Sequence, residues 1–101
     1  MRSLQRTKWR GLWVSPAGSG AYAIWILRAD AAGVTASVTW TDRSGQEVSR
    51  TWDGTLRDGR LVFQFRNDVT ELGLAGDQLR GFFFVSASRE RGEISLTGTP
   101  H

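Results

Sequence analysis

Residues 34–41 read VTASVTWT, and apolar and polar residues alternate along this stretch without interruption. A period of two is typical of a β-strand that turns one face to a core and the other to water. Val34, Ala36, Val38 and Trp40 would share the dry face. The same alternation returns in three later stretches: residues 47–53, 61–66 and 93–99. The pattern predicts half-buried strands of one antiparallel sheet.

Turn-forming dipeptides divide the rest of the chain at intervals of 9 to 15 residues. They are Ala32-Gly33, Ser44-Gly45, Asp58-Gly59, Asn67-Asp68, Gly76-Asp77 and Arg91-Gly92. The segments between them predict eight strands, at residues 9–14, 21–29, 34–41, 47–53, 61–66, 69–75, 78–88 and 93–99. Short strands at this spacing, with no room for a substantial helix, predict an all-β fold: a single eight-stranded antiparallel up-and-down barrel.

Length and composition are those of one globular domain, with 101 residues, 40% of them hydrophobic and 23% charged. We expect residues 1–8 to be a basic, flexible segment and residues 9–101 to form the barrel. The net charge is +3. Five tryptophans, five phenylalanines and one tyrosine can fill a small core or line a pocket.

Several kinds of chemistry are excluded by composition. The chain has no cysteine, and its one histidine is the last residue, His101. A Ser-His-Asp triad and the usual zinc ligand sets therefore cannot be assembled, and no carboxylates have calcium-loop spacing. We predict no catalytic residues, no metal and no cofactor. Without a run of 18 apolar residues or a signal peptide, we expect no membrane span and, if the chain is complete, a cytoplasmic protein.

Two segments, residues 21–29 and 78–88, are apolar on both faces. One face of each must point outward from a closed barrel, and a monomer rarely leaves a large apolar patch bare. We therefore predict a homodimer through Trp25, Leu27, Phe82 and Phe84. The alternative is that the N-terminal segment folds over these residues.

A polar residue interrupts the dry face of segment 47–53, where Arg50 lies between Val48 and Trp52. Its guanidinium could anchor an anionic or carbonyl-bearing ligand. Alternatively, Arg50 could lie at the barrel end with its head in water. Tyr22 and Arg28 are expected on one face of segment 21–29, where the Tyr22 hydroxyl could donate a hydrogen bond to a ligand or lie at a rim or interface.

Together these considerations predict a ligand site in the barrel interior or mouth. Its residues are Tyr22, Trp40, Arg50, Trp52, Phe63, Phe65 and Phe83. Four aspartates are instead read as turn residues that cap backbone groups: Asp42, Asp53, Asp58 and Asp77.

The motif Gly11-Leu12-Trp13 on the first strand, followed by an eight-strand meander, resembles the calycin group of lipocalins, fatty-acid-binding proteins and avidin-like barrels. The resemblance implies a barrel that binds small apolar molecules. It also implies that Trp13 closes one barrel end and packs against an arginine near the last strand, Arg89 or Arg91. The chain is short for a lipocalin and has no terminal helix.

The leading functional hypothesis is a binding module for an apolar or amphipathic small molecule. One alternative is an enzyme of the cyclase or isomerase type that acts through shape, without a triad or metal. A second is a non-catalytic protein-interaction or assembly domain. Nucleic-acid binding ranks lower, because the clearest strands place their aromatic residues on the dry face, where bases cannot stack on them.

Overall fold

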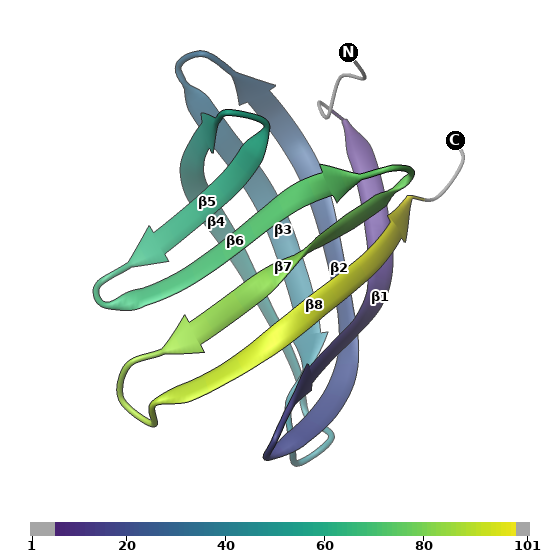
Figure 1. The fold of residues 1–101 in the computed structure, drawn as a ribbon, viewed down its shortest axis with the longest axis vertical. Helices are drawn as coiled ribbons and strands as arrows, with labels where there is room; N and C mark the ends of the chain where they lie inside the picture. Colours follow the sequence, from purple (N-terminus) through teal and green to yellow (C-terminus); the bar gives the residue numbers. More distant parts are fainter. Residues whose placement is uncertain (1–5, 99–101) are drawn as a thin grey trace.

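A computed structural model describes residues 6–98, and its regular secondary structure in this range is entirely β-strand. The strands are β1 (Thr7–Ser15), β2 (Gly18–Asp30), β3 (Gly33–Thr41), β4 (Glu47–Arg57), β5 (Arg60–Phe65), β6 (Asp68–Ala75), β7 (Gln78–Val85) and β8 (Glu90–Gly98). Each strand pairs with the next, and β1 pairs with β8 to close the barrel (Figure 1). The predicted fold class is confirmed. Within residues 6–98 there is no helix of the length and hydropathy needed to cross a membrane.

The closing pair joins β1 and β8 in antiparallel register, from Trp9 opposite Gly98 to Val14 opposite Glu93. The start of β1 therefore lies beside the end of β8 (Figure 1). At this end of the barrel the β2–β3, β4–β5 and β6–β7 turns also gather, and the other four turns lie at the opposite end. The two ends differ in how they are filled.

Two predicted turns are wrong. Asp53, predicted as a turn residue, lies with Gly54 inside β4, where Asp53 accepts a hydrogen bond from the Thr35 hydroxyl at 2.8 Å. The chain turns later, at Asp58 and Gly59, whose φ angles of 52° and 78° suit a tight hairpin. Similarly, Arg91-Gly92 belongs to β8, and residues 86–89 form the turn before it. A turn-forming dipeptide inside a strand misleads because cross-strand pairing outweighs local preference.

A β-bulge in β2 corrects the prediction that Tyr22 and Arg28 share a face. Ile26 pairs with Ala36, whereas Arg28 pairs with Thr35, so the register shifts between them. One extra residue in a strand reverses the faces that follow it. Arg28 consequently points outward, where its guanidinium donates to Asp30 at 3.0 Å.

The hydrophobic core fills the half of the barrel nearest the start of β1. Its largest fully buried side chains come from seven strands, all except β4: Trp9, Ile24, Ile26, Val34, Val38, Leu61, Leu72, Leu79, Ile94 and Leu96. The dry faces predicted for the half-buried strands agree with this core at Val34, Ala36, Val38, Leu61 and Phe63.

Glycines opposite large rings make room for them inside the barrel. Gly20 faces Trp13, and Gly92 faces Phe83. A Cβ atom on Gly20 would lie 2.6 Å from the Trp13 indole nitrogen, and one on Gly92 would lie 2.4 Å from the Phe83 ring. The bulk of each ring therefore occupies the space that its partner leaves empty.

Candidate functional site

The end of the barrel opposite the packed core holds a cavity of about 400 Å³. It lies where β1, β3, β5 and β7 end and the following strands begin. The lining residues are Trp13, Tyr22, Trp40, Asp42, Arg43, Arg50, Trp52, Phe65, Asp68, Thr70, Phe83, Phe84, Val85 and Glu90. Its size falls in the range of small-molecule sites. The packed core therefore occupies one half of the barrel, and the cavity lies at the opposite end.

Aromatic rings form a continuous row around one side of the barrel. Tyr22 on β2 is stacked near Trp40 on β3, with centroids 6.5 Å apart and planes 19° apart. Trp40 contacts Trp52 on β4 at 5.6 Å, and Trp52 contacts Phe63 on β5 at 5.7 Å. Trp40 and Trp52 are only partly buried, because they face the cavity. Flat apolar molecules pack well against such a wall.

Trp13 is a further wall residue, held by two interactions. Its indole N–H donates a hydrogen bond to the Thr41 carbonyl oxygen at 2.7 Å. Its ring meets that of Phe83 edge to face, with centroids 5.9 Å apart and an interplanar angle of 85°. Trp13 therefore lines the open end of the barrel.

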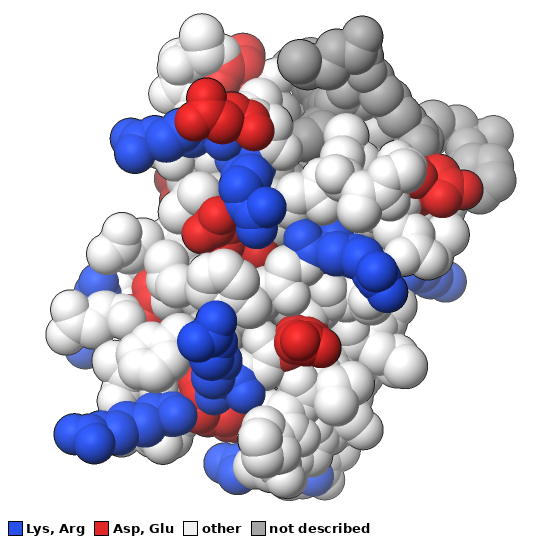
Figure 2. All heavy atoms as spheres, in the orientation of Figure 1, with Lys and Arg blue, Asp and Glu red and all other residues white. Residues whose placement is uncertain are grey.

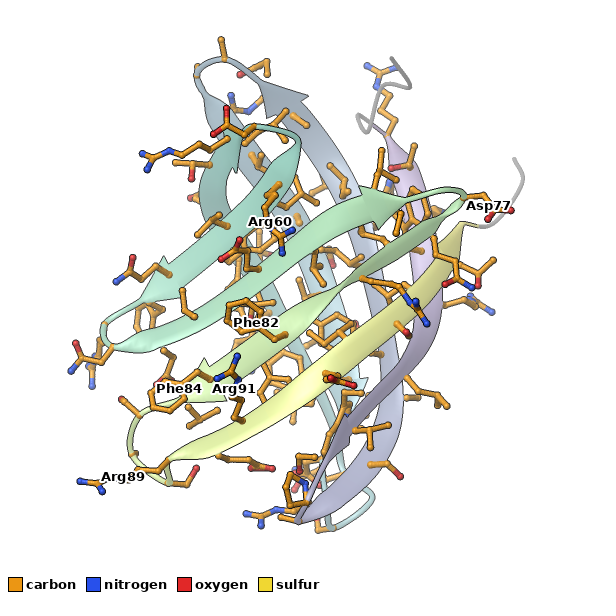
Figure 3. All side chains as sticks on the ribbon, viewed as in Figure 1. Arg60, Asp77, Phe82, Phe84, Arg89 and Arg91 are labelled. Carbon is orange, nitrogen blue, oxygen red and sulfur yellow. The ribbon has the colours of Figure 1, made fainter. Side chains whose placement is uncertain are left out.

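The arginine packing implied by the calycin resemblance is replaced by other contacts. Arg91 lies over the ring of Phe82 at 5.3 Å, on the outer face of β7 and β8 (Figure 3). Arg89 is exposed in the turn between these strands and points away from the barrel (Figure 3). Outward-facing positions of β7 and β8 place Phe82 and Arg91 together, and neither side chain belongs to the interior.

Charged side chains surround the cavity opening. Asp42 accepts hydrogen bonds from the hydroxyl and backbone N–H of Ser44 at 2.6 and 2.9 Å, and from the backbone N–H of Gln46 at 3.0 Å. These bonds, above all that from the Ser44 hydroxyl, hold the pKa of Asp42 below its ordinary value. The hydroxyl of Ser15 donates to Glu90 at 3.0 Å and joins β1 to β8 at the opening. Asp42 therefore acts as the predicted turn cap and also lines the opening.

Tyr22 is the polar residue of the inner wall. Its side chain is buried, and burial raises the pKa of the phenol above its ordinary value. The hydroxyl oxygen has no hydrogen-bond partner among the described residues. Because a neutral phenol can both donate and accept, this buried group has unused hydrogen-bonding capacity.

Arg50 lies on the inward face of β4, as its position between Val48 and Trp52 predicts, but its side chain is exposed. The guanidinium donates to the Ser49 carbonyl oxygen at 2.8 Å. It lines the cavity opening with its head toward water. This placement avoids the cost of burying an unpaired charge.

The structure brings six of the seven predicted site residues to the cavity. Phe63 is the exception, since it is buried behind Trp52 and lines only a smaller neighbouring cavity. Phe65 lies at the edge with 66% of its surface exposed. Trp13 and Thr70 line the cavity but were not among the predicted site residues. The period of two could have identified both: Trp13 lies on the same face of β1 as the buried Trp9, and Thr70 lies on the same face of β6 as the buried Leu72.

The barrel wall is least complete between β4 and β5. Only three residue pairs join these strands, from Thr55–Val62 to Arg57–Arg60, whereas eight join β3 and β4. A second cavity of about 280 Å³ lies along this β4–β5 seam. It shares Trp52, Phe65, Asp68 and Thr70 with the larger cavity. The candidate site therefore extends sideways toward the seam.

No family model, curated protein or solved structure matches the chain in comparisons with known proteins. Across residues 6–98, no group of three or more metal-ligating side chains gathers around a common point. The arrangement offers an aromatic interior, buried hydroxyls and a charged rim.

Proposed function

We propose that the protein binds one small apolar or amphipathic molecule in the cavity at the open end of the barrel. The observation that carries this proposal is the cavity of about 400 Å³ beside the wall of Trp13, Tyr22, Trp40 and Trp52. An eight-stranded barrel has an interior just wide enough to be filled by side chains or to hold one small ligand. Here the side chains leave part of that interior open.

The distribution of polarity favours an amphipathic ligand. Aromatic rings occupy the inner wall, whereas Asp42, Arg43, Arg50 and Glu90 lie at the opening. A molecule with an apolar body and one polar end would match both regions. The apolar body would remove ring surface from water, which is the main source of affinity in such sites.

The fold adds support by analogy. A closed eight-stranded antiparallel barrel is compatible with a calycin-like architecture, and binding of small apolar molecules is common in that group. Fold alone does not define function, so the proposal depends on the cavity. We propose binding without catalysis, in which the ligand leaves chemically unchanged.

Intrinsic fluorescence provides the first test, because Trp13, Trp40 and Trp52 line the cavity. We expect the neutral probe N-phenyl-1-naphthylamine to quench tryptophan emission saturably and to be recovered unchanged by chromatography. The variant Val85→Trp adds bulk to the cavity lining and should weaken binding about tenfold or more, since the overpacked site loses its space. The matched variant Val14→Trp adds the same bulk on the outer face of β1 and should bind as the wild type does.

A flat titration of the wild-type protein would contradict the proposal, as would equal binding by Val85→Trp. A chemically altered probe would favour the shape-directed enzyme over a binding module. Extraction of the natively purified protein, followed by mass spectrometry, would then identify any ligand that remains bound.

Figure 2 shows positive and negative side chains interspersed over the face formed by β5 to β8. Neither sign forms a continuous patch on this face. Phosphate backbones are bound by concentrated positive charge, so this face does not favour the nucleic-acid alternative.

We also propose self-association through the outer surface. Trp25 on β2 is 45% exposed, and Leu12 and Val14 on β1 are 57% and 51% exposed. In the order β2-β1-β8-β7, two strands separate Trp25 and Leu27 from Phe82 and Phe84, so a dimer contact must also include β1 and β8.

Analytical ultracentrifugation at micromolar concentration should show a dimer, and Leu12→Lys should produce a monomer. A monomeric wild-type protein would end this proposal.

A further inference from the structure

The position of Tyr22 in the barrel gives its hydroxyl a restricted environment. Tyr22 lies in the middle of the β1–β2–β3 sheet, where its pair partners are Gly11 and Trp40. Gly11 has no side chain to contribute, and Trp40 presents an aromatic ring. Only 5% of the Tyr22 surface is exposed. The immediate neighbours on both strands therefore offer no side-chain hydrogen-bond acceptor.

The lack of a partner is unusual for a buried hydroxyl. The Tyr22 hydroxyl forms no hydrogen bond with any of the described residues. Burying a hydroxyl without a hydrogen bond costs free energy, and most buried polar atoms in native proteins do have a partner. Other atoms of the Tyr22 side chain line the cavity, so a molecule bound there lies next to the residue whose hydroxyl lacks an acceptor.

We propose that the ligand is a flat aromatic molecule with a neutral acceptor oxygen, such as a ketone, aldehyde or quinone carbonyl, that receives a hydrogen bond from Tyr22. This inference rests on the proposed function and specifies the ligand class. The body of the molecule would pack against Trp13, Trp40 and Trp52, and the carbonyl would point toward β2.

The surrounding charges favour a neutral acceptor over an anion. The two arginines that line the cavity, Arg43 and Arg50, are exposed at its opening. A carboxylate buried near Tyr22 would lie among aromatic rings without a paired cation, which is costly. The raised pKa of the phenol also keeps its proton in place, so Tyr22 acts as a donor at neutral pH.

The test combines one isosteric variant with two matched ligands. Tyr22→Phe removes only the hydroxyl. Of the ligands, 2-acetonaphthone has a carbonyl, whereas 2-ethylnaphthalene has a similar shape without one. Equilibrium dialysis of each ligand against wild-type protein and Tyr22→Phe gives four dissociation constants, and thermal unfolding of the ligand-free proteins checks the fold.

We expect Tyr22→Phe to weaken binding of 2-acetonaphthone about five- to tenfold, the size of one buried hydrogen bond. Binding of 2-ethylnaphthalene should stay equal or become tighter. The ligand-free variant should unfold at the same temperature as the wild type or higher, because an unpaired hydroxyl is removed from the interior.

Each other outcome has a distinct meaning. If wild-type protein and Tyr22→Phe bind the ketone equally, the inference is wrong, although small-molecule binding stands; a trapped water would then satisfy the hydroxyl. Equal weakening of both ligands would show that Tyr22 acts only through wall shape and would also overturn the inference. If neither ligand binds the wild-type protein, the inference is wrong. If N-phenyl-1-naphthylamine does not bind either, the proposed function is wrong too.

Discussion

The Trp13 indole N–H donates a hydrogen bond to the main-chain carbonyl of Thr41, 2.7 Å away. Trp13 belongs to β1 and Thr41 ends β3, so the bond spans β2 and connects two strands that do not pair with each other. It also fixes the indole against Phe83 at the cavity. One side chain therefore contributes both to barrel stability and to the shape of the candidate site.

Replacing Trp13 with Phe should lower the free energy of unfolding by about 2–3 kcal/mol, because the Thr41 carbonyl loses its donor and the smaller ring leaves a void. Urea denaturation followed by circular dichroism measures the change. Trp25→Phe is the matched control, since Trp25 lies on the outer surface. With both variants made in the monomeric Leu12→Lys protein, so that self-association does not contribute, it should change stability by at most about 0.5 kcal/mol. Similar losses in the two variants would contradict this role of Trp13.

Glycine at position 92 should be necessary for the inner wall. In Gly92→Ala the new Cβ would lie 2.4 Å from the Phe83 ring and 2.7 Å from the Val14 carbonyl oxygen. We expect a loss of about 1–3 kcal/mol in unfolding free energy, the usual cost of overpacking. In Gly73→Ala the Cβ meets only the flexible Arg60 side chain, at 3.1 Å. That control should unfold near the wild-type denaturant concentration; if it loses as much as Gly92→Ala, the steric explanation is wrong.

Arg50 should contribute to ligand charge preference and not to folding, because its guanidinium is exposed at the cavity opening. Arg50→Met should weaken binding of 8-anilinonaphthalene-1-sulfonate about two- to fivefold, as expected for an exposed ion pair. The neutral analogue N-phenyl-1-naphthylamine should bind unchanged. Arg57→Met, at the other end of β4, serves as the control in both fluorescence titrations. Unchanged sulfonate binding by Arg50→Met would dismiss this role.

Stability should decrease at acidic pH because of two turn carboxylates. Hydrogen bonds from the Ser44 hydroxyl to Asp42 and from the Ala32 N–H to Asp30 lower both pKa values from the ordinary 3.8. A carboxyl whose pKa is lower in the folded state stabilises the fold above its unfolded pKa, and this contribution is lost as the pH falls through the folded pKa. The unfolding free energy should therefore fall below about pH 4.

The variant Asp42→Asn isolates one of these contributions. Its stability deficit relative to wild type should be largest at neutral pH and should shrink toward pH 2, as measured by urea denaturation across that range. A deficit that is constant with pH would mean that the charge of Asp42 does not contribute.

The fold was predictable because alternation and turn residues act locally. The stretch VTASVTWT became β3 with the expected faces, and Asp58-Gly59 formed the expected hairpin turn. The bulge after Ile26 was not predictable, because it depends on how β2 bends against β3. Similarly, Asp53 was misread as a turn residue because its place inside β4 depends on pairing with β3.

The site was partly predictable for the same reason. The alternation of apolar and polar residues correctly placed Trp40 and Trp52 on the inner face of the barrel. It did not show how far along the barrel axis each residue lies, so Phe63 could not be distinguished from the cavity residues. The lack of a partner for the Tyr22 hydroxyl depends on three strands at once and required the structure.

The β4–β5 seam makes the enclosure of the barrel uneven. Because only three residue pairs hold these strands together, separating β4 from β5 would break fewer main-chain hydrogen bonds than opening the barrel at the β1–β8 closure, which has six pairs. A bound molecule longer than the cavity would then reach out between Trp52 and Phe65 and would push β4 and β5 apart. If the cavity binds the proposed ligand, molecules of different length would share the same packed base of the barrel and differ only where they meet the β4–β5 seam.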